Sequence, residues 1–191
     1  MLIEGSLTTP ETLAKELGLV YDDLTQVEKD NIDVCINVAT EKIEFFCNRK
    51  FKLQEHTYVD EINGTKLVLP VFPIVEINNT SPELDFDTDI QRYNSGVINL
   101  NAAGKGLTEI TYTAGWKLPS EEDRDLPYTI ELAAIKLAAS GYKSIGKIIS
   151  EQKIKSEKSF DYSYSVFEVK GSMSFSYEIT NLLEQWVIKT C

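Results

Sequence analysis

The chain has 191 residues, 42% of them hydrophobic and 26% charged, which is an ordinary composition for a folded globular protein. Thirty acidic side chains against 19 basic ones give a formal net charge of -11, and this argues against a DNA-reading domain, because affinity for phosphates comes from Lys and Arg. No apolar run approaches the roughly 20 residues that span a bilayer, and MLIEGSLTTPE lacks the features of a signal peptide, so we expect a protein that stays in the cytosol that makes it.

The residues most often used in catalysis and metal binding are few. The three cysteines, Cys35, Cys47 and Cys191, form no CxxC pair, so free thiols are expected and neither a disulfide framework nor a zinc site is indicated. The single histidine, His56, lies among polar residues, and we interpret it as a surface or packing residue. No GxSxG, HExxH or P-loop motif is present, which argues against a small hydrolase, and we expect no cofactor.

The first fifty residues predict two helices. Thr9-Pro10-Glu11 is typical of a helix start and Gly18 of its stop. A capping box at 25–28 then begins a long helix that runs to about Asn48. Its buried stripe is predicted from spacings of three and four, and comprises Ile32, Cys35, Ile36, Ala39, Ile43 and Phe46. Its opposite face is interpreted as a solvated side carrying Glu28, Asp33, Glu41, Lys42 and Glu44.

Between residues 51 and 118 the period changes to two and turn residues multiply, which predicts a run of short strands. The Asn63-Gly64 pair predicts a hairpin that joins HTYVDEI to TKLVLPV. The closing strand is ITYTAGW, at 110–116, where Gly115 permits a bend.

Alternating acids at Asp85, Asp87 and Asp89 allow two interpretations. The DxDxD spacing matches the opening of an EF-hand loop, but Ile90 stands where the loop needs glycine and Gly96 where it needs the bidentate glutamate. We therefore interpret the three acids as the solvent face of a strand whose other face, Leu84 to Ile90, packs inward.

The last third of the chain predicts a buried alanine-rich helix, PYTIELAAIKLAASGYK, packed closely against other helices. Residues 143–158 follow with five lysines against two glutamates, and we interpret them as an exposed basic arm interrupted at Gly146. Alternating aromatic residues at 160–166 predict a strand, and an amphipathic helix from Ile179 to Val187 is expected to dock the C-terminal segment.

These elements predict an α+β fold: a small bundle of about four helices with an inserted antiparallel β section. The expected division is 1–50 for the first helical half, 51–118 for the β section, and 119–191 for the second helical half with the basic arm and the aromatic strand.

The order of elements resembles a known family. FFCNRKF at the end of the long helix, LVLPVFPIVEI, ITYTAGW, the helix PYTIELAAIKLAASGY and a late segment at 149–164, which begins with Ile-Ser and ends with DYSY, are similar to the head-tail connector proteins of tailed bacteriophages, also called adaptor or head-completion proteins. The resemblance covers roughly residues 26–188.

The resemblance implies a non-enzymatic structural protein of the virion neck, made in the host cytoplasm. It implies a homo-oligomeric ring, commonly of twelve copies, beneath the portal, with the portal and a tail-side neck or tail-completion protein as partners. DNA would pass through the ring transiently and without specific binding, and no membrane is involved. Asp85, Asp87 and Asp89 are candidate acids of the channel, where they would repel the phosphate backbone.

Ring contacts between neighbours are heterologous, so each subunit needs two different complementary surfaces. The candidate interface residues, toward another subunit or the portal, are Lys147, Lys153, Lys155, Phe160, Tyr162, Tyr164 and Trp186. The alternative for this part of the chain is a solvated lysine loop followed by an ordinary internal strand.

A second class of function stays open at this point: a β-rich ligand- or carbohydrate-binding module with helical flanks. Its platform would be the aromatic residues Tyr58, Tyr93 and Trp116. These residues could equally cover the seam between the β section and the helices.

Overall fold

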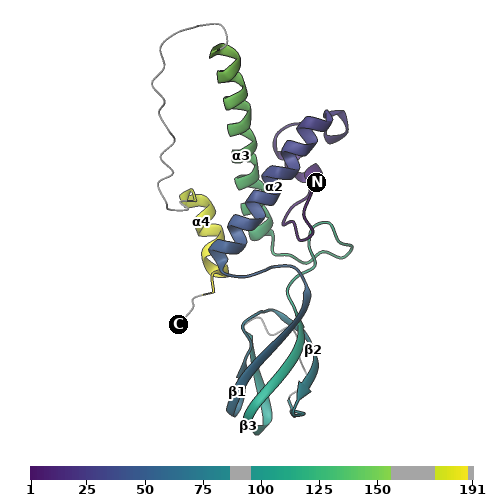
Figure 1. Ribbon diagram of the computed structural model, residues 1–191, viewed down its shortest axis with the longest axis vertical. Coiled ribbons are helices and arrows are strands. Elements are labelled where there is room, and N and C mark those ends of the chain that lie inside the picture. The colour runs from purple at the N-terminus through teal and green to yellow at the C-terminus, as the bar shows by residue number, and fades with distance from the viewer. Residues whose placement is uncertain (87–95, 156–174, 189–191) are drawn as a thin grey trace. The chain divides into compact units, whose positions relative to one another are not determined.

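The computed structural model describes residues 1–86, 96–155 and 175–188, with side chains left out at 146–155. The chain forms two compact units: Met1–Cys47 together with Pro127–Cys191, and Asn48–Leu126 (Figure 1). In the described residues the first unit is helical and the second contains a three-stranded antiparallel sheet. The α+β fold with an inserted β section is therefore confirmed.

The helical unit contains four α-helices and two short 3-10 helices within the described ranges. They are α1 Pro10–Glu16, η1 Tyr21–Asp23, α2 Gln26–Cys47, α3 Tyr128–Lys155, α4 Tyr177–Leu183 and η2 Glu184–Trp186. Their core lies where α1, α2 and α3 meet, and its buried residues are Leu13, Ala14, Ile32, Cys35, Ile36, Ala39, Ala138 and Ala139. The small alanines of α3 let its backbone approach α2 closely, as the sequence predicts.

Local capping signals fix the helix ends. The Thr9 hydroxyl accepts a hydrogen bond of 3.3 Å from the amide of Thr12 at the start of α1. At α2 the Thr25 hydroxyl accepts from the amide of Glu28, and the Glu28 carboxylate accepts from the amide of Thr25 at 2.9 Å, so the predicted capping box forms in both directions. Asn48 follows α2 with φ 52°, the left-handed geometry common just after a helix.

The predicted solvated face of α2 needs one correction. Glu44 is buried, with only 9% of its surface exposed. The C-terminal segment packs on these last turns of α2, because the ring of Phe175 meets that of Phe46 edge-on at 5.0 Å and the amide of Ile188 donates to the carbonyl oxygen of Cys47 at 3.0 Å. The docking predicted for the C-terminal segment is thus confirmed.

The basic segment also differs from its prediction as an arm interrupted at Gly146. α3 continues as one helix of 28 residues through Gly146 to Lys155. A glycine inside a helix costs only about 1 kcal/mol relative to alanine, which the surrounding helix-forming residues offset. The basic residues up to Lys155 therefore lie on a helix.

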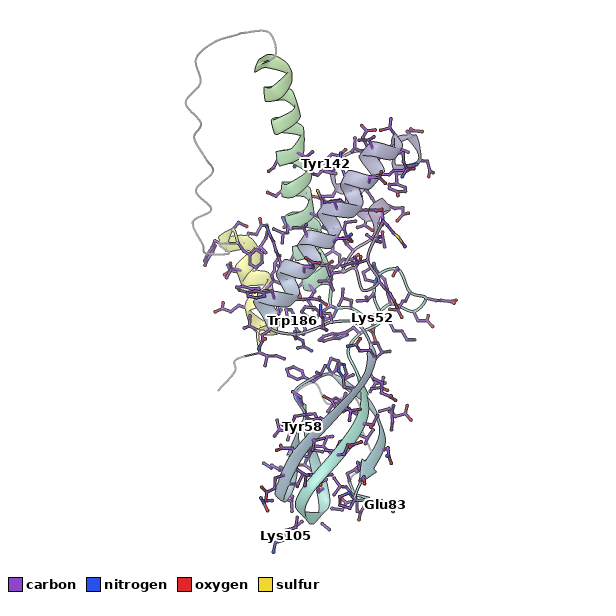
Figure 2. All side chains as sticks on the ribbon, in the orientation of Figure 1. Lys52, Tyr58, Glu83, Lys105, Tyr142 and Trp186 are labelled. Carbon is purple, nitrogen blue, oxygen red and sulfur yellow. The ribbon has the colours of Figure 1, made fainter. Side chains whose placement is uncertain are left out.

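The β unit contains β1 Gln54–Val68, β2 Ile74–Ser81 and β3 Val97–Ala114, in the spatial order β1-β3-β2 with antiparallel pairing. In Figure 2, Lys52 and Lys105 mark opposite ends of this unit. Its core residues are Ile62, Leu67, Leu69, Ile74, Ile98, Leu100, Ile110, Tyr112 and Ala114.

The hairpin predicted at Asn63-Gly64 is wrong. β1 passes straight through this pair, which sits at an irregularity of the ladder where Gly64 faces Gly104. A type I′ turn needs positive φ at both central residues, but among the described non-glycine residues only Asn48 and Asp123 have it. Long-range pairing with β3 on both sides of Gly64 overrides the local turn signal.

The bend predicted at Gly115 is confirmed. Its φ is 113°, and a Cβ there would lie 2.5 Å from the carbonyl oxygen of Lys52. The next residue is held to the incoming chain twice, since the amide of Trp116 donates to the oxygen of Phe51 and the amide of Leu53 donates to the oxygen of Trp116, both at 2.8 Å. The close approach of two backbones explains why the position requires glycine.

Candidate assembly surfaces

The structure divides the predicted basic and aromatic interface residues into two groups. Lys147, Lys153 and Lys155 lie in the last turns of α3, where the backbone alone is described. Phe160, Tyr162 and Tyr164 lie outside the described residues, as does the strand predicted for them. Their role as interface residues stays a prediction.

Trp186 lies in η2 and is partly buried. Its indole Nε1 donates a hydrogen bond of 3.1 Å to the hydroxyl of Thr129 in the first turn of α3. Trp186 therefore joins the end of the chain to α3 (labelled in Figure 2), and its predicted part in an intersubunit interface is not tested by this contact.

Of the three predicted channel acids, Asp85 is described and exposed. Its side chain accepts a hydrogen bond of 3.0 Å from the amide group of Asn101, and its backbone oxygen accepts from the amide nitrogen of the same residue at 2.9 Å. Leu84 and Phe86 on either side pack against the core of the β unit, as the alternation predicts. Asp87 and Asp89 lie outside the described residues.

The aromatic platform considered for a ligand-binding module is not assembled by the described residues. Trp116 is only 6% exposed, and the Arg49 guanidinium lies 4.8 Å from its ring. The same guanidinium lies over the rings of Phe72 and Phe51, at 4.4 and 5.3 Å, and donates a hydrogen bond to the Phe72 carbonyl oxygen. Tyr58 packs on the β core, and Tyr93 lies outside the described residues. Trp116 thus belongs to a buried cation–π cluster.

The feature that sequence analysis missed is on the outer side of α2. Four large apolar residues, Val27, Val34, Val38 and Phe45, are exposed by 69, 52, 43 and 73% of their surface. At 100° per residue they fall on one line along the helix, opposite the buried stripe. We call these four residues the α2 seam. The spacing of 7, 4 and 7 residues was visible in the sequence, but the stronger buried stripe on the same helix concealed it.

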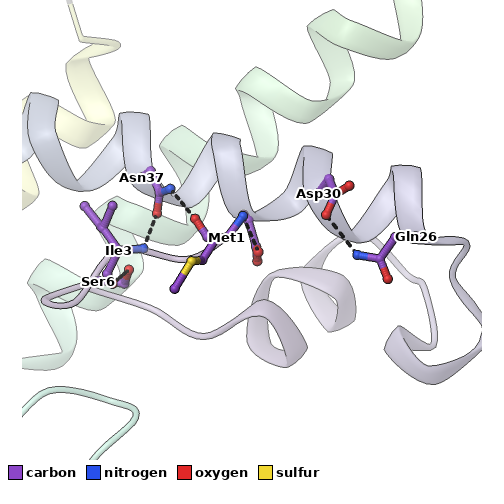
Figure 3. A network of polar contacts seen from close by, with 7 residues as sticks. Met1, Ile3, Ser6, Gln26, Asp30 and Asn37 are labelled. Carbon is purple, nitrogen blue, oxygen red and sulfur yellow. Dashed lines mark hydrogen bonds and ion pairs between the residues drawn. The ribbon is translucent and has the colours of Figure 1, made fainter.

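The N-terminal segment runs alongside α2 (Figure 3), and its contacts with Asp33 and Asn37 form one border of the seam. The Asn37 side chain accepts a hydrogen bond of 3.0 Å from the amide of Ile3 and donates one of 3.1 Å to the carbonyl oxygen of Met1, and the amino terminus lies 3.3 Å from the Asp33 carboxylate. Asp30, which accepts a 2.9 Å hydrogen bond from Gln26, follows the same border. Residues 1–47 as a whole carry ten acids against three lysines, so this part of the helical unit is acidic.

The other border of the seam is a groove between α2 and α3 with a volume of about 370 Å³. Its lining is mainly apolar, and α3 contributes Leu137, Gly141 and Ile145 to it. Val34 and Val38 belong both to the seam and to the groove wall. Burial raises the pKa of the Cys35 thiol, which also lines the groove, so the thiolate form is disfavoured there.

The part of the chain that the structure describes was also searched for a metal site and for a titratable catalytic group. His, Cys, Asp and Glu side chains form no group of three suited to a metal ion within these residues. Burial lowers the pKa of His56, the single histidine, whose ring lies 5.6 Å from that of Tyr112. No helix within the described ranges is long and apolar enough to cross a membrane.

Comparison with solved structures finds the same fold over the whole chain. One match is a chain from the neck of an empty GTA particle computed with C6 symmetry, with a TM-score of 0.57 and 15% identity. Another is from the virion of a native gene transfer agent (GTA) particle, with a TM-score of 0.56 and 16% identity. Each match covers 100% of this chain and 95% of the other. No family model and no curated protein matches the sequence.

At these identities the matches establish a shared fold. The helical unit with its inserted β unit is the fold of a chain found in a virion neck, and the fold expected from the resemblance to head-tail connectors is thereby confirmed.

Proposed function

We propose that this chain is a structural protein of a virion neck: a head-tail connector, or adaptor, that forms a ring beneath the portal, extends the DNA channel and joins capsid to tail. The observation that carries the proposal is the match in fold to a neck chain over 100% of this chain and 95% of the other. A match of both units together supports a common role more strongly than a match of either unit alone, because each unit by itself is a simple arrangement.

The proposed ring is homo-oligomeric. The similar neck was computed with C6 symmetry, and a twelve-copy ring is compatible with a sixfold axis. The proposed partners are the portal on one side and a tail-side neck or tail-completion protein on the other. Lys147, Lys153 and Lys155 are proposed to face acidic surface on a neighbour or the portal, and Phe160, Tyr162, Tyr164 and Trp186 to complete the interface.

The charge of the chain fits passage of DNA without retention. A net charge of -11 leaves little to hold a phosphate backbone, and exposed acids such as Asp85 would repel it. We propose that Asp85, Asp87 and Asp89 face the channel. The role requires no catalytic group, no cofactor and no membrane contact.

The composition and assembly of particles test this proposal. The chain should be detected in purified particles at a fixed number of copies per portal, and cross-linking mass spectrometry should join it to the portal protein. Deleting its gene should leave filled or emptied heads that lack tails. Normal, tailed, infectious particles after deletion, or particles that do not contain the chain, would refute the neck assignment.

A further inference from the structure

The α2 seam has the spacing of a helix-packing surface. Val27, Val34, Val38 and Phe45, with the polar residues Asn31 and Glu41 between them, follow one another at intervals of four and three residues. This is the heptad spacing that buries one helix against another. The inner stripe of α2 is already used by α1 and α3, so the seam is a second helix-packing face on the same helix.

The borders of the seam limit what can occupy it. On one side the N-terminal segment is fixed to Asp33 and Asn37, and on the other α3 packs beside Cys35 and Ala39. The exposed fractions of 43 to 73% show that the described part of the chain leaves the seam itself uncovered. The seam itself is about 27 Å long, from 18 residues at a rise of 1.5 Å each, so a partner helix could contact it over about five turns.

We propose that the α2 seam receives the last turns of α3 from a second copy of this chain. Charge favours this occupant, because residues 1–47 carry ten acids against three lysines whereas residues 143–155 carry four lysines against one glutamate. The sequence also places isoleucines at 145, 148 and 149, the spacing of an apolar helix face. Asp30 and Glu41, both exposed beside the seam, would lie near the incoming lysines.

This contact joins two different surfaces, the α2 seam of one copy and the end of α3 of the next. A heterologous contact of this kind propagates from copy to copy and closes into a ring when the rotation permits. The inference therefore rests on the proposed neck function and names the surfaces by which neighbouring subunits would meet.

The first experiment measures self-association of the full chain by sedimentation over a range of concentrations. The wild type should exceed its monomer mass of 21.6 kDa, and the double variant Val34→Asp, Val38→Asp should associate at least about tenfold more weakly. Val20→Asp is the matched control: Val20 is 63% exposed, belongs to the same unit and lies outside the seam. It should associate like the wild type, and circular dichroism should show equal helix content in all three proteins.

The second experiment identifies the partner segment by exchanging charges. Lys147→Glu with Lys153→Glu should weaken self-association, and so should Asp30→Lys with Glu41→Lys. Combining the four substitutions should restore association toward the wild-type value, because the pairs again have opposite sign. Additive loss in the combined variant would overturn α3 as the occupant.

Two further outcomes would overturn the proposal. One is a wild type that stays monomeric at all concentrations. The other is a seam variant that associates like the wild type, which would mean that something else covers the seam, such as residues 156–174 of the same chain. Neither outcome shows whether the chain is present in particles. The proposed neck function is therefore tested separately, by particle composition and gene deletion.

Discussion

The indole nitrogen of Trp186 donates a hydrogen bond of 3.1 Å to the hydroxyl oxygen of Thr129, 57 residues earlier in the chain. It joins η2 to the first turn of α3, and an ion pair of 2.8 Å between Lys136 and Glu178 links α3 to α4 about two turns further along. The C-terminal segment is thus held to α3 at two levels, as well as to the end of α2 through Ile188.

We expect Trp186→Phe to lower the free energy of unfolding by about 1 kcal/mol, since it removes the donor while keeping an aromatic ring. Thr129→Val removes the acceptor and should cost a similar amount. The double variant should cost less than the two single losses added together, because both remove the same bond. Chemical denaturation gives the three values, and strict additivity would show that the hydrogen bond contributes nothing.

A glycine substitution tests the bend that ends β3. Gly115→Ala should destabilise the protein by about 3 kcal/mol or more, because the new Cβ would overlap backbone atoms of Lys52, which cannot move aside without breaking the hydrogen bonds of Phe51 and Leu53 to Trp116. Gly106→Ala is the matched control: its φ of 99° is also positive, but nothing lies within 4 Å of the new Cβ. Its cost should stay near the 1–2 kcal/mol of backbone strain alone. Equal losses in thermal melts would contradict the close-approach explanation.

His56 is the single histidine of the chain, and it should make the free energy of unfolding depend on pH near and below the pKa of a free histidine. Burial lowers its pKa in the folded state, and its Nε2 has no hydrogen-bond partner among the described residues. Above the unfolded pKa of about 6.5 the ring is neutral in both states. As the pH falls below that value the unfolded chain takes up the proton first, so stability should decline until the folded pKa is passed. His56→Gln should flatten this part of the curve, and an unchanged slope in the variant would assign it to other groups.

The excess of acid predicts weak interaction with DNA. Duplex DNA should not be retained by the purified protein at 150 mM salt, and any binding at low salt should disappear as salt rises. Electrophoretic mobility shift and fluorescence anisotropy both measure this. Tight binding that is insensitive to salt would contradict the proposed non-adhesive channel.

The helical ends were predictable because their signals are local. Thr9, Thr25 and Glu28 act within one turn of the chain, and the buried stripe of α2 repeats often enough to identify its face. The pairing of the strands was harder to predict from the sequence. Asn63-Gly64 has a strong local preference for a turn, but pairing with residues some 40 positions away keeps it inside β1.

Of the two surfaces in the proposed contact, the basic end of α3 was predicted from the sequence and the α2 seam was not. Lysines concentrated between 143 and 158 are visible in the composition, whereas the complementary seam depends on which of two apolar stripes of α2 is covered by α1 and α3. That choice is a matter of tertiary packing. The network of Met1, Ile3 and Asn37 at the border of the seam has no sequence signal at all, because ordinary residues are joined there across more than 30 positions.

The paired backbone of Phe51, Leu53 and Trp116 has a mechanical consequence. Strand β1 begins at Gln54 and strand β3 ends at Ala114, and these two residues are partners at the same end of the ladder. A pull on the two connections would therefore load the hydrogen bonds between β1 and β3 one after another, beginning with the two bonds of Trp116.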